Sequence, residues 1–456
     1  MILPSIPRLP KPPGTMTAST PFNAGATETE PFPGYIYLDA MAFGMGNCCI
    51  QQTFGTRCIA SAAYLYDQYL PLTPILLVIS SSCPVYKGKL SDFDNRFTLI
   101  MQGVDDRTDE ERDPTSSKYI CKSRYSPAYS YISDSKYSYD FYNDYPHFPI
   151  NDDYYKQLLD GGLSPKLAQH FANILCRDPL VIFEKKLQID DENDMTHFEN
   201  LNSTNWNSLR FKLPRPADHD TCFKVEIRPC DLQITPYENT ALFSLMLGLY
   251  GVIMHYDVNF ILPISLVDEN FNRAFKNDAI NKEKFWWRIN SIKNMEMDKA
   301  DYKKYSNEER PPLTLEEDLR DNIKELTVNE IMNGCERYNY PGLVNIVLHA
   351  LENKYKTNKL SEYIKFLSKR AAGELWTDAK LVRNFIMNHP KYQHNSEINE
   401  EINYDLICYL MEIQKGHIKP KESITRGERE NDYEMRMLNN LANKYPLSRL
   451  REIIKI

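Results

Sequence analysis

The sequence predicts an α+β fold in which helices pack around the outside of a group of strands. Residues 209–213 and 222–234 alternate apolar and polar side chains, which is typical of half-buried strands. Residues 343–410 instead repeat apolar side chains at helical spacing, so the last third of the chain is expected to be mainly helical. A hydrophobic content of 42% with 25% charged residues is ordinary for a globular protein of 456 residues.

The amino-terminal elements are predicted from proline content and apolar spacing. Residues 1–34 are rich in proline and small polar side chains, which cannot build a core, so an extended, mostly disordered lead is expected. Residues 35–38 alternate like a strand, and residues 59–70 carry apolar side chains near helical spacing. The two prolines that follow are expected to end this helix before the apolar run at 75–79.

The middle of the chain mixes loops, helices and strands. Tyr, Ser and Asp dominate residues 116–155, which predicts a loop-rich segment whose tyrosines mostly pack or lie on the surface; a ligand-binding aromatic loop is the alternative. Ser164 as cap and Pro165 in the first turn predict the start of a helix. Residues 280–330 are rich in Lys, Glu, Asp and Asn and are expected to form solvated helices and linkers. The predicted regions are a lead at 1–34, an α+β region at 35–290 and a mainly helical region at 291–456.

Charge and cysteine content exclude several classes of protein. A net charge of −8 argues against a nucleic-acid partner, which needs a basic face, although a few local arginines can still hold anionic small molecules. Ten cysteines without paired spacing predict reduced thiols in the cytoplasm, with neither a disulfide framework nor a zinc site. The longest apolar run, at 240–256, is shorter than the roughly 20 residues of a membrane span, so a buried helix is expected. No signal peptide is recognised at the amino terminus.

Residues 39–54 form the most informative segment. Gly44 and Gly46 interrupt an apolar run, which then delivers Asn47, two adjacent thiols and Gln51. Glycine lets a backbone approach a ligand closely, and carboxamides both donate and accept hydrogen bonds without carrying charge. From these residues alone two interpretations stay open, a glycine-kinked strand end before a buried helix, or a segment that lines a binding site.

Further short motifs are spread along the chain. They are Tyr64-Leu65-Tyr66-Asp67, Val104-Asp105-Asp106-Arg107-Thr108, Lys122-Ser123-Arg124-Tyr125, Arg177-Asp178-Pro179-Leu180, His197-Phe198-Glu199-Asn200, Ser203-Thr204-Asn205-Trp206, Val225-Glu226-Ile227-Arg228-Pro229, Val267-Asp268-Glu269-Asn270, Lys369-Arg370-Ala371-Ala372-Gly373-Glu374-Leu375 and Asn388-His389-Pro390. With the glycine-containing segment, and in this order, they resemble the catalytic subunit of eukaryotic glutamate–cysteine ligase. The resemblance spans roughly residues 35 to 415.

This resemblance implies a fold, a reaction and a set of ligands. The fold would be a glutamine-synthetase-like antiparallel sheet around the active site, surrounded by helices. The reaction would join L-glutamate to L-cysteine through γ-glutamyl phosphate, with ATP as co-substrate and Mg²⁺ as cofactor. Some family members also bind a modifier subunit through a disulfide. Because no cysteine lies between Cys335 and Cys408, only non-covalent pairing is expected here.

Glu226 and Arg228 lie two residues apart in a predicted strand and should therefore share one face. In isolation, this pattern is typical of a solvated ion pair. The resemblance implies instead that Glu226 binds magnesium together with Gln51, and that Arg228 contacts phosphate and substrate.

The resemblance also implies a glutamate pocket and a nucleotide site. Arg96 would bind the α-carboxylate of glutamate, a task that suits a two-pronged guanidinium, although Asp92 or Asp94 are alternative structural partners. Tyr155 would lie near the acceptor cysteine, with Tyr154 as the neighbouring alternative. The remaining pocket residues would be Met45, Asn47 and Cys49, and the remaining nucleotide contacts Lys122, Arg124, Asn205 and Arg210, which could equally hold loops together.

One departure from the family is expected to matter. Family chains begin far upstream of the glycine-containing segment, and that region carries a Glu-x-Glu strand that binds most of the magnesium. Here Glu28 and Glu30 lie in a lead without a strand pattern. The sequence is therefore expected to be a truncated gene model with little activity as it stands. The alternatives are a non-catalytic chain that binds substrates or a partner, and a related ligase with another acceptor amine.

Overall fold

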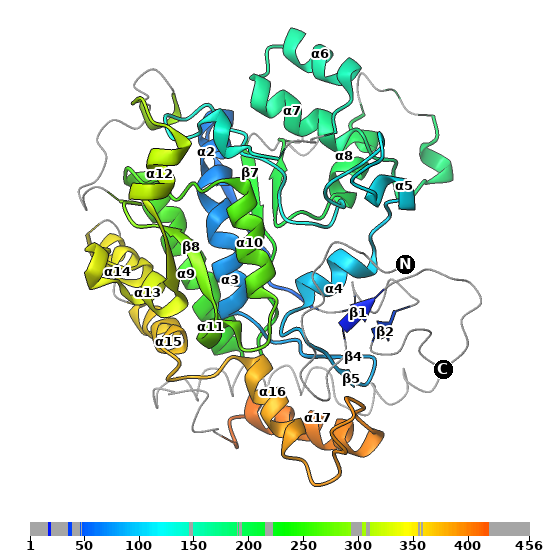
Figure 1. The fold of residues 1–456 in the computed structure, drawn as a ribbon, viewed down its shortest axis with the longest axis vertical. Coiled ribbons are helices and arrows are strands. Elements are labelled where there is room, and N and C mark those ends of the chain that lie inside the picture. Colours follow the sequence, from blue (N-terminus) through cyan, green and yellow to red (C-terminus); the bar gives the residue numbers. More distant parts are fainter. Residues whose placement is uncertain are drawn as a thin grey trace.

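The fold was analysed in a computed structural model of the chain, shown in Figure 1. The structure describes residues 17–19, 35–38, 46, 48–145, 149–188, 190, 194–214, 222–292, 303–306, 311–353, 356 and 359–418. Within these residues, helices surround small and mostly antiparallel sheets. The predicted α+β class is therefore confirmed.

A three-stranded antiparallel sheet lies at the centre of the site region. Its order is β3 (Gln52–Thr56), β7 (Phe223–Ile227) and β6 (Leu209–Lys212), with β7 in the middle. Side chains alternate between the two faces of a strand, and one face buries Phe54, Val225 and Phe211. This apolar face packs against α2 (Ile59–Tyr69) and α9 (Pro236–His255), so the polar face is directed away from the core.

The predicted helix at 59–70 is confirmed by α2, which ends at Tyr69. The two prolines then occupy the first turns of η1 (Leu70–Leu72) and α3 (Thr73–Ile79), where a missing N–H costs no hydrogen bond. The apolar run at 75–79 is helical and wholly buried in α3. α2 and α3 lie one after the other next to β7 in Figure 1.

The strand predicted at 222–234 is shorter in the structure. β7 ends at Ile227, and the ladder resumes only at an isolated bridge between Cys49 and Asp231. Three residue steps separate Cys49 from Gln52, whereas four separate Ile227 from Asp231, so β7 carries one extra residue there. Proline has no N–H to donate to the ladder, and Pro229 lies inside this bulge, which explains the early end of the strand.

The prediction that residues 280–330 form only solvated helices and linkers is wrong. The segment contains an antiparallel pair, β8 (Lys284–Arg288) and β9 (Ile323–Thr327). Most of its apolar side chains, including Phe285 and Leu326, are fully buried, and the average composition of the segment, which is rich in charged residues, conceals this local pattern. The pairing joins segments on both sides of residue 290, and the predicted division there stays a prediction.

The described residues from 343 to 414 are mainly helical, as the sequence predicts for 343–410. They contain α14 (Leu343–Asn353), α15 (Ser361–Ala371), α16 (Asp378–Met387) and α17 (Glu400–Gln414). α14 and α15 pack on α9, whereas α16 and α17 form the lower end of the molecule in Figure 1. Among the described residues, no helix combines the length and apolar character required to cross a membrane.

Three other local predictions are confirmed. The strand expected at 35–38 is β2 (Tyr35–Tyr37), and the helix expected after Ser164 is α7 (Pro165–Ile174), although the Ser164 hydroxyl makes no capping hydrogen bond. Most of the tyrosines between 116 and 145 pack inside, as Tyr131 and Tyr142 do. Apart from Thr17–Ser19, which pairs with β2, residues 1–34 lie outside the described residues.

The remaining helices and strands of the described residues are, in chain order, β1 (Thr17–Ser19), β2 (Tyr35–Tyr37), β4 (Val85–Tyr86), β5 (Lys89–Leu90), α4 (Arg96–Gly103), α5 (Asp109–Arg112), η2 (Asp140–Tyr142), α6 (Asp152–Asp160), α7 (Pro165–Ile174), η3 (Glu184–Lys186), α8 (Thr196–Thr204), α10 (Ile264–Ala274), α11 (Ala279–Lys282), η5 (Lys303–Tyr305), α12 (Leu315–Asp321), α13 (Val328–Asn333) and η6 (Glu336–Tyr338).

Candidate functional site

The polar face of the central sheet concentrates charge. Glu226 of β7 lies directly opposite Thr53 of β3 and Arg210 of β6, and Lys212 lies opposite Lys224. Side chains two apart share a face, so these residues line one side of the sheet. In a chain with a net charge of −8, this face gathers cations around a single carboxylate of β7.

Glu226 is buried and held by several donors. Its Oε2 accepts a hydrogen bond from Thr53 Oγ1 at 3.2 Å and contacts the amine of Lys212, while its Oε1 lies 3.5 Å from Nε of Arg228. Burial raises the pKa of Glu226, but Lys212, Arg228 and Arg210 together outweigh burial and lower it. The carboxylate is therefore ionised and surrounded by positive charge at neutral pH.

Arg228 is almost fully buried, with 5% of its surface exposed. Its Nη1 donates to the Asn205 carbonyl at 3.1 Å, and its guanidinium lies over the Trp206 ring at 4.8 Å from the centroid. Burial lowers the pKa of Arg228 to about 10, even though Glu226 favours the charged form. The side chain therefore stays cationic at neutral pH and is fixed in position by packing on both sides.

Arg96 lies beside this pair at the first position of α4. Its Nη2 donates to the main-chain carbonyl of Arg228 at 3.1 Å, and its Nε lies 3.6 Å from Oδ1 of Asp231. Asp231 also accepts from the Arg96 amide at 3.3 Å and the Ser82 amide at 3.0 Å. Burial raises the pKa of Asp231 to about 7, against the opposing effect of Arg96. Asp231 is thus a carboxylate partner of Arg96, whereas Asp94 pairs with a different arginine, as described below.

The glycine-containing segment reaches the same place. Cys49 pairs with Asp231 through its backbone, and Nε2 of Gln51 donates to Sγ of Cys49 at 3.4 Å. Cys49 is close enough to Arg228 to affect its pKa. The structure therefore brings together Glu226, Arg228, Arg96, Arg210, Cys49 and Gln51, while the predicted pocket residues Met45 and Asn47 lie outside the described residues.

Two predicted nucleotide contacts lie in buried ion pairs of their own. Lys122 contacts Asp268 at 2.6 Å and donates to a main-chain carbonyl at 3.0 Å. Arg124 contacts Asp106 at 2.7 Å, and its carbonyl accepts from the Trp206 amide at 2.7 Å. Arg124 thereby supports the segment that packs on Arg228. Their predicted role in ATP binding stays a prediction.

Asn205 contacts the residues around Glu226 and Arg228, whereas Tyr155 lies on a different helix. Asn205 contacts Arg228 through its carbonyl, while its side chain caps the end of α8 by donating to Leu201 at 2.8 Å. Tyr155 is half-buried on α6, which lies at the upper end of the molecule in Figure 1. Its role near the acceptor cysteine, and the choice between Tyr155 and the exposed Tyr154, stay predictions.

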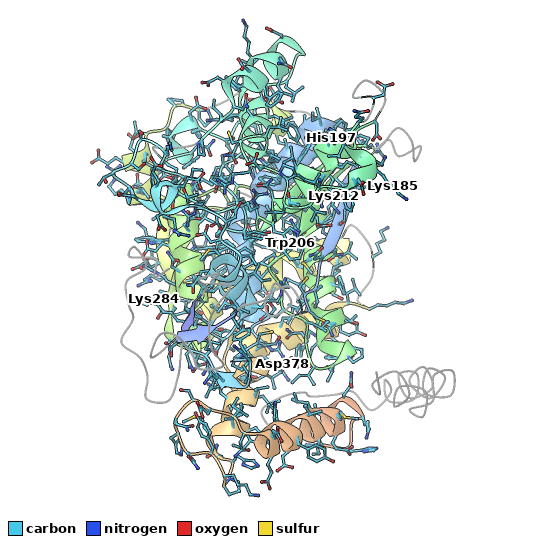
Figure 2. All side chains as sticks on the ribbon, turned by 90° about the vertical axis from the view of Figure 1, so that its right-hand side faces the viewer. Lys185, His197, Trp206, Lys212, Lys284 and Asp378 are labelled. Atoms are coloured by element: carbon cyan, nitrogen blue, oxygen red, sulfur yellow. The ribbon has the colours of Figure 1, made fainter. Side chains whose placement is uncertain are left out.

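Four residues of the cluster were not among the predicted site residues. Trp206 belongs to a motif that carries the family resemblance, and Lys212 follows Arg210 by two positions in a strand, so both had a local signal. Thr53 belongs to the glycine-containing segment at 39–54, but nothing local indicated its pairing with Glu226. Asp231 had no local signal, because its role depends on distant segments. Figure 2 labels Lys212 and Trp206 in the same region of the molecule.

The cluster can contribute oxygen ligands to a hard cation. Mg²⁺ is usually held by one or two carboxylates together with water and substrate phosphates. The Glu226 carboxylate and the Gln51 amide oxygen have this chemistry and therefore fit part of such a shell. Among the described residues no group of three or more His, Cys, Asp or Glu side chains could hold a metal on its own.

Comparisons with known proteins show the family to which the chain belongs. The glutamate–cysteine ligase family model matches residues 13–413. Glutamate–cysteine ligase of Schizosaccharomyces pombe is 40% identical over 401 residues, which cover 87% of this chain and 56% of that protein. The catalytic subunits of Mus musculus and Homo sapiens are 39% and 41% identical, over 92% and 84% of this chain and 65% and 59% of their own lengths.

The chain thus spans between 56% and 65% of the length of these curated relatives. The matched residues nevertheless include the three strands of the central sheet and all the residues that surround Glu226 and Arg228. The chain belongs to the glutamate–cysteine ligase family.

Proposed function

We propose that this chain carries the substrate-binding and phosphate-binding face of an enzyme that joins the γ-carboxylate of L-glutamate to the amine of L-cysteine, the first step of glutathione biosynthesis. The observation that carries the proposal is the fixed cluster of Arg228, Arg96 and Glu226 on the polar face of the sheet. Family membership supplies the reaction class, and the cluster supplies groups suited to it.

The proposed reaction proceeds in two steps. The γ-carboxylate of glutamate attacks the terminal phosphorus of ATP, forming an acyl phosphate and releasing ADP. The amine of cysteine then attacks the acyl carbon, so that the amide bond forms, the carbon–oxygen bond to phosphate breaks and the amine loses a proton. Phosphoryl transfer depends mainly on positioning and on charge stabilisation.

Arg228 would stabilise the transferring phosphoryl group. It is preorganised by Asn205 and Trp206, and a buried fixed cation is more effective than a flexible exposed one. Arg210 and Lys212 would contact the outer phosphates from the neighbouring strand. Bound Mg²⁺ would neutralise phosphate charge, with Glu226 and Gln51 as its protein ligands. Lys212 would then leave the Glu226 carboxylate and turn toward the nucleotide.

Arg96 would bind the α-carboxylate of glutamate. Its Nε makes no hydrogen bond within the described residues but lies 3.6 Å from Asp231, so the carboxylate of glutamate would share the guanidinium with Asp231. Cys49, with Met45 and Asn47, would line the same pocket, and Tyr155 would lie on the cysteine side. Lys122, Arg124 and Asn205 would act on the nucleotide side, in part by supporting its walls.

The proposal also covers the complete sheet, a partner subunit and the location in the cell. The three-stranded sheet would form part of a glutamine-synthetase-like antiparallel sheet. The relatives from Mus musculus and Homo sapiens are named catalytic subunits, so the partner would be a second subunit. It would bind without a disulfide, because no cysteine lies between Cys335 and Cys408. The location would be the cytoplasm, and neither a nucleic acid nor a membrane would be a partner.

The experiment measures phosphate release and γ-glutamylcysteine formation by the purified protein with ATP, Mg²⁺, glutamate and cysteine, next to glutamate binding by calorimetry. We expect saturable glutamate binding and low product formation that requires cysteine. Binding without turnover would support a non-catalytic chain. If another amine replaced cysteine efficiently, the related ligase would be favoured. The absence of glutamate binding would contradict the proposed site.

A further inference from the structure

The loop that leads into Arg96 is held from the carboxy-terminal region. Nε of Arg383 on α16 donates to Oδ1 of Asp94 at 2.6 Å. Its Nη2 donates to the carbonyls of Ser91 and Phe93 at 2.6 and 2.8 Å. Arg383 is only 8% exposed, so one buried guanidinium binds three acceptors in the five residues that precede Arg96.

The same helix also holds the segment that follows Arg228. Oδ2 of Asp378, at the start of α16, accepts from the Ile234 amide at 2.7 Å. The next residue of the helix donates its amide to the carbonyl of Ser81 at 3.1 Å. Asp378 is 1% exposed, and Figure 2 shows it where α16 meets the body of the molecule. A single helix of ten residues therefore contacts both segments that carry the two arginines of the site.

We infer that α16 fixes the distance between Arg96 and Arg228, and that Arg383 is the positioning residue for Arg96. The inference rests on the proposed function, in which Arg96 binds glutamate. It adds that the carboxy-terminal helices determine the geometry of the glutamate pocket, and that Arg383 does so through its hydrogen bonds to Asp94, Ser91 and Phe93 and not through a hydrogen bond to either arginine of the site.

The physical reason lies in the geometry of the guanidinium. Arginine presents several N–H donors in a rigid planar fork, whereas lysine presents one compact ammonium on a flexible stem. Lysine at position 383 keeps the charge but cannot satisfy Asp94 and both carbonyls in the same geometry. The loop then gains freedom, and a displacement of about 1 Å at a binding group can cost up to a hundredfold in function.

The test compares Arg383→Lys with the matched control Arg288→Lys. Arg288 is also buried, with 2% of its surface exposed, and lies in β8. It binds Asp318 at 2.6 and 2.7 Å, a main-chain carbonyl at 2.8 Å and the Tyr142 hydroxyl at 2.9 Å. Hydrogen exchange of residues 91–100 is measured in the full chain, together with calorimetric binding of glutamate and of Mg-ATP.

We expect Arg383→Lys to accelerate amide exchange in residues 91–100 and to weaken glutamate binding by about tenfold or more, with Mg-ATP affinity changed less than about twofold. Arg288→Lys should lower stability without this pattern. If the amides of residues 91–100 exchange at the same rate in Arg383→Lys and Arg288→Lys, the inference is overturned, whether or not glutamate binds. If Arg383→Lys does not fold, Asp94→Asn, which removes the carboxylate that Arg383 binds, must give the same local acceleration, and its failure to do so would also overturn the inference.

Failure of the proposed function gives a different result. If Arg96→Lys leaves glutamate binding unchanged, then Arg96 is not the carboxylate-binding residue. If Arg96→Lys weakens binding while Arg383→Lys does not, only the positioning role is wrong. In the double variant the two effects should be less than additive, because both act through the position of one guanidinium.

Discussion

The guanidinium of Arg96 donates a hydrogen bond to the main-chain carbonyl of Arg228, at 3.1 Å from Nη2 to the oxygen. Two cations that would repel each other are thereby joined through the backbone. Each also has its own carboxylate, Asp231 for Arg96 and Glu226 for Arg228. The arrangement keeps two positive groups near one another in a buried place, as the proposed binding of a carboxylate next to a phosphate would require.

Replacement of Arg228 by alanine should lower turnover by about tenfold to a hundredfold or more, because one preorganised charge stabiliser is removed. The measurement is steady-state phosphate release with ATP, glutamate and cysteine. Arg320→Ala is a suitable control, because Arg320 is exposed and pairs only locally with Asp321. Wild-type rates in Arg228→Ala would contradict the assignment.

Replacement of Arg96 by lysine should raise KM for glutamate and leave KM for ATP almost unchanged. Lysine keeps the charge but loses the two-pronged geometry that suits a carboxylate. Initial rates with each substrate varied in turn give both constants. Equal damage to the two constants would indicate a structural role for Arg96 with Asp231.

Lys122→Met should lower the free energy of unfolding by about 3 to 5 kcal/mol, because it leaves Asp268 buried without its cation. Urea denaturation measures this loss, and adding Asp268→Asn should recover part of it. Lys212→Met, by comparison, should weaken Mg-ATP binding, because Lys212 is half-buried on the polar face of the sheet. The reverse pattern would show that Lys122 is the nucleotide contact.

Gly248→Ala should destabilise the packing of α9 on α14. A Cβ at this position would lie 2.3 Å from Cγ1 of Val347, so one of the helices must shift. Overpacking of this kind typically costs about 1 to 3 kcal/mol. Thermal unfolding tests the loss, and Val347→Ala in the same chain should restore most of it. A neutral Gly248→Ala variant would show that the two helices are free to separate.

Asp67 should make stability depend on pH. Burial raises its pKa to about 6, although Ser133 and Ile132 donate hydrogen bonds that lower it. The unfolded value is about 3.9, so between about pH 4 and 6 the folded state binds more protons and the free energy of unfolding falls as pH rises.

The Asp67→Asn variant lacks this titration. Its free energy of unfolding, relative to the wild type, should therefore increase by about 1.4 kcal/mol for each pH unit between about pH 4 and 6. Chemical denaturation at a series of pH values gives the difference. A difference that stays constant across this range would show that Asp67 titrates near its ordinary pKa.

Local pattern was enough to predict much of this protein. The apolar spacing at 59–70 and 343–410 predicted helices that the structure contains. Period-two alternation placed Glu226 and Arg228 on one face, and they form an ion pair there. These predictions succeed because neighbours along a helix or a strand are also neighbours in space, so the sequence carries the information directly.

The partners of the charged residues were decided only by tertiary structure. The partners lie far apart in the sequence: 135 residues separate Arg96 from Asp231, 146 separate Lys122 from Asp268, and 289 separate Arg383 from Asp94. The chain has 54 basic and 62 acidic side chains, so composition alone cannot select one pair. Burial selects it, because a charge removed from water is stable only beside the partner that the packed elements bring to it.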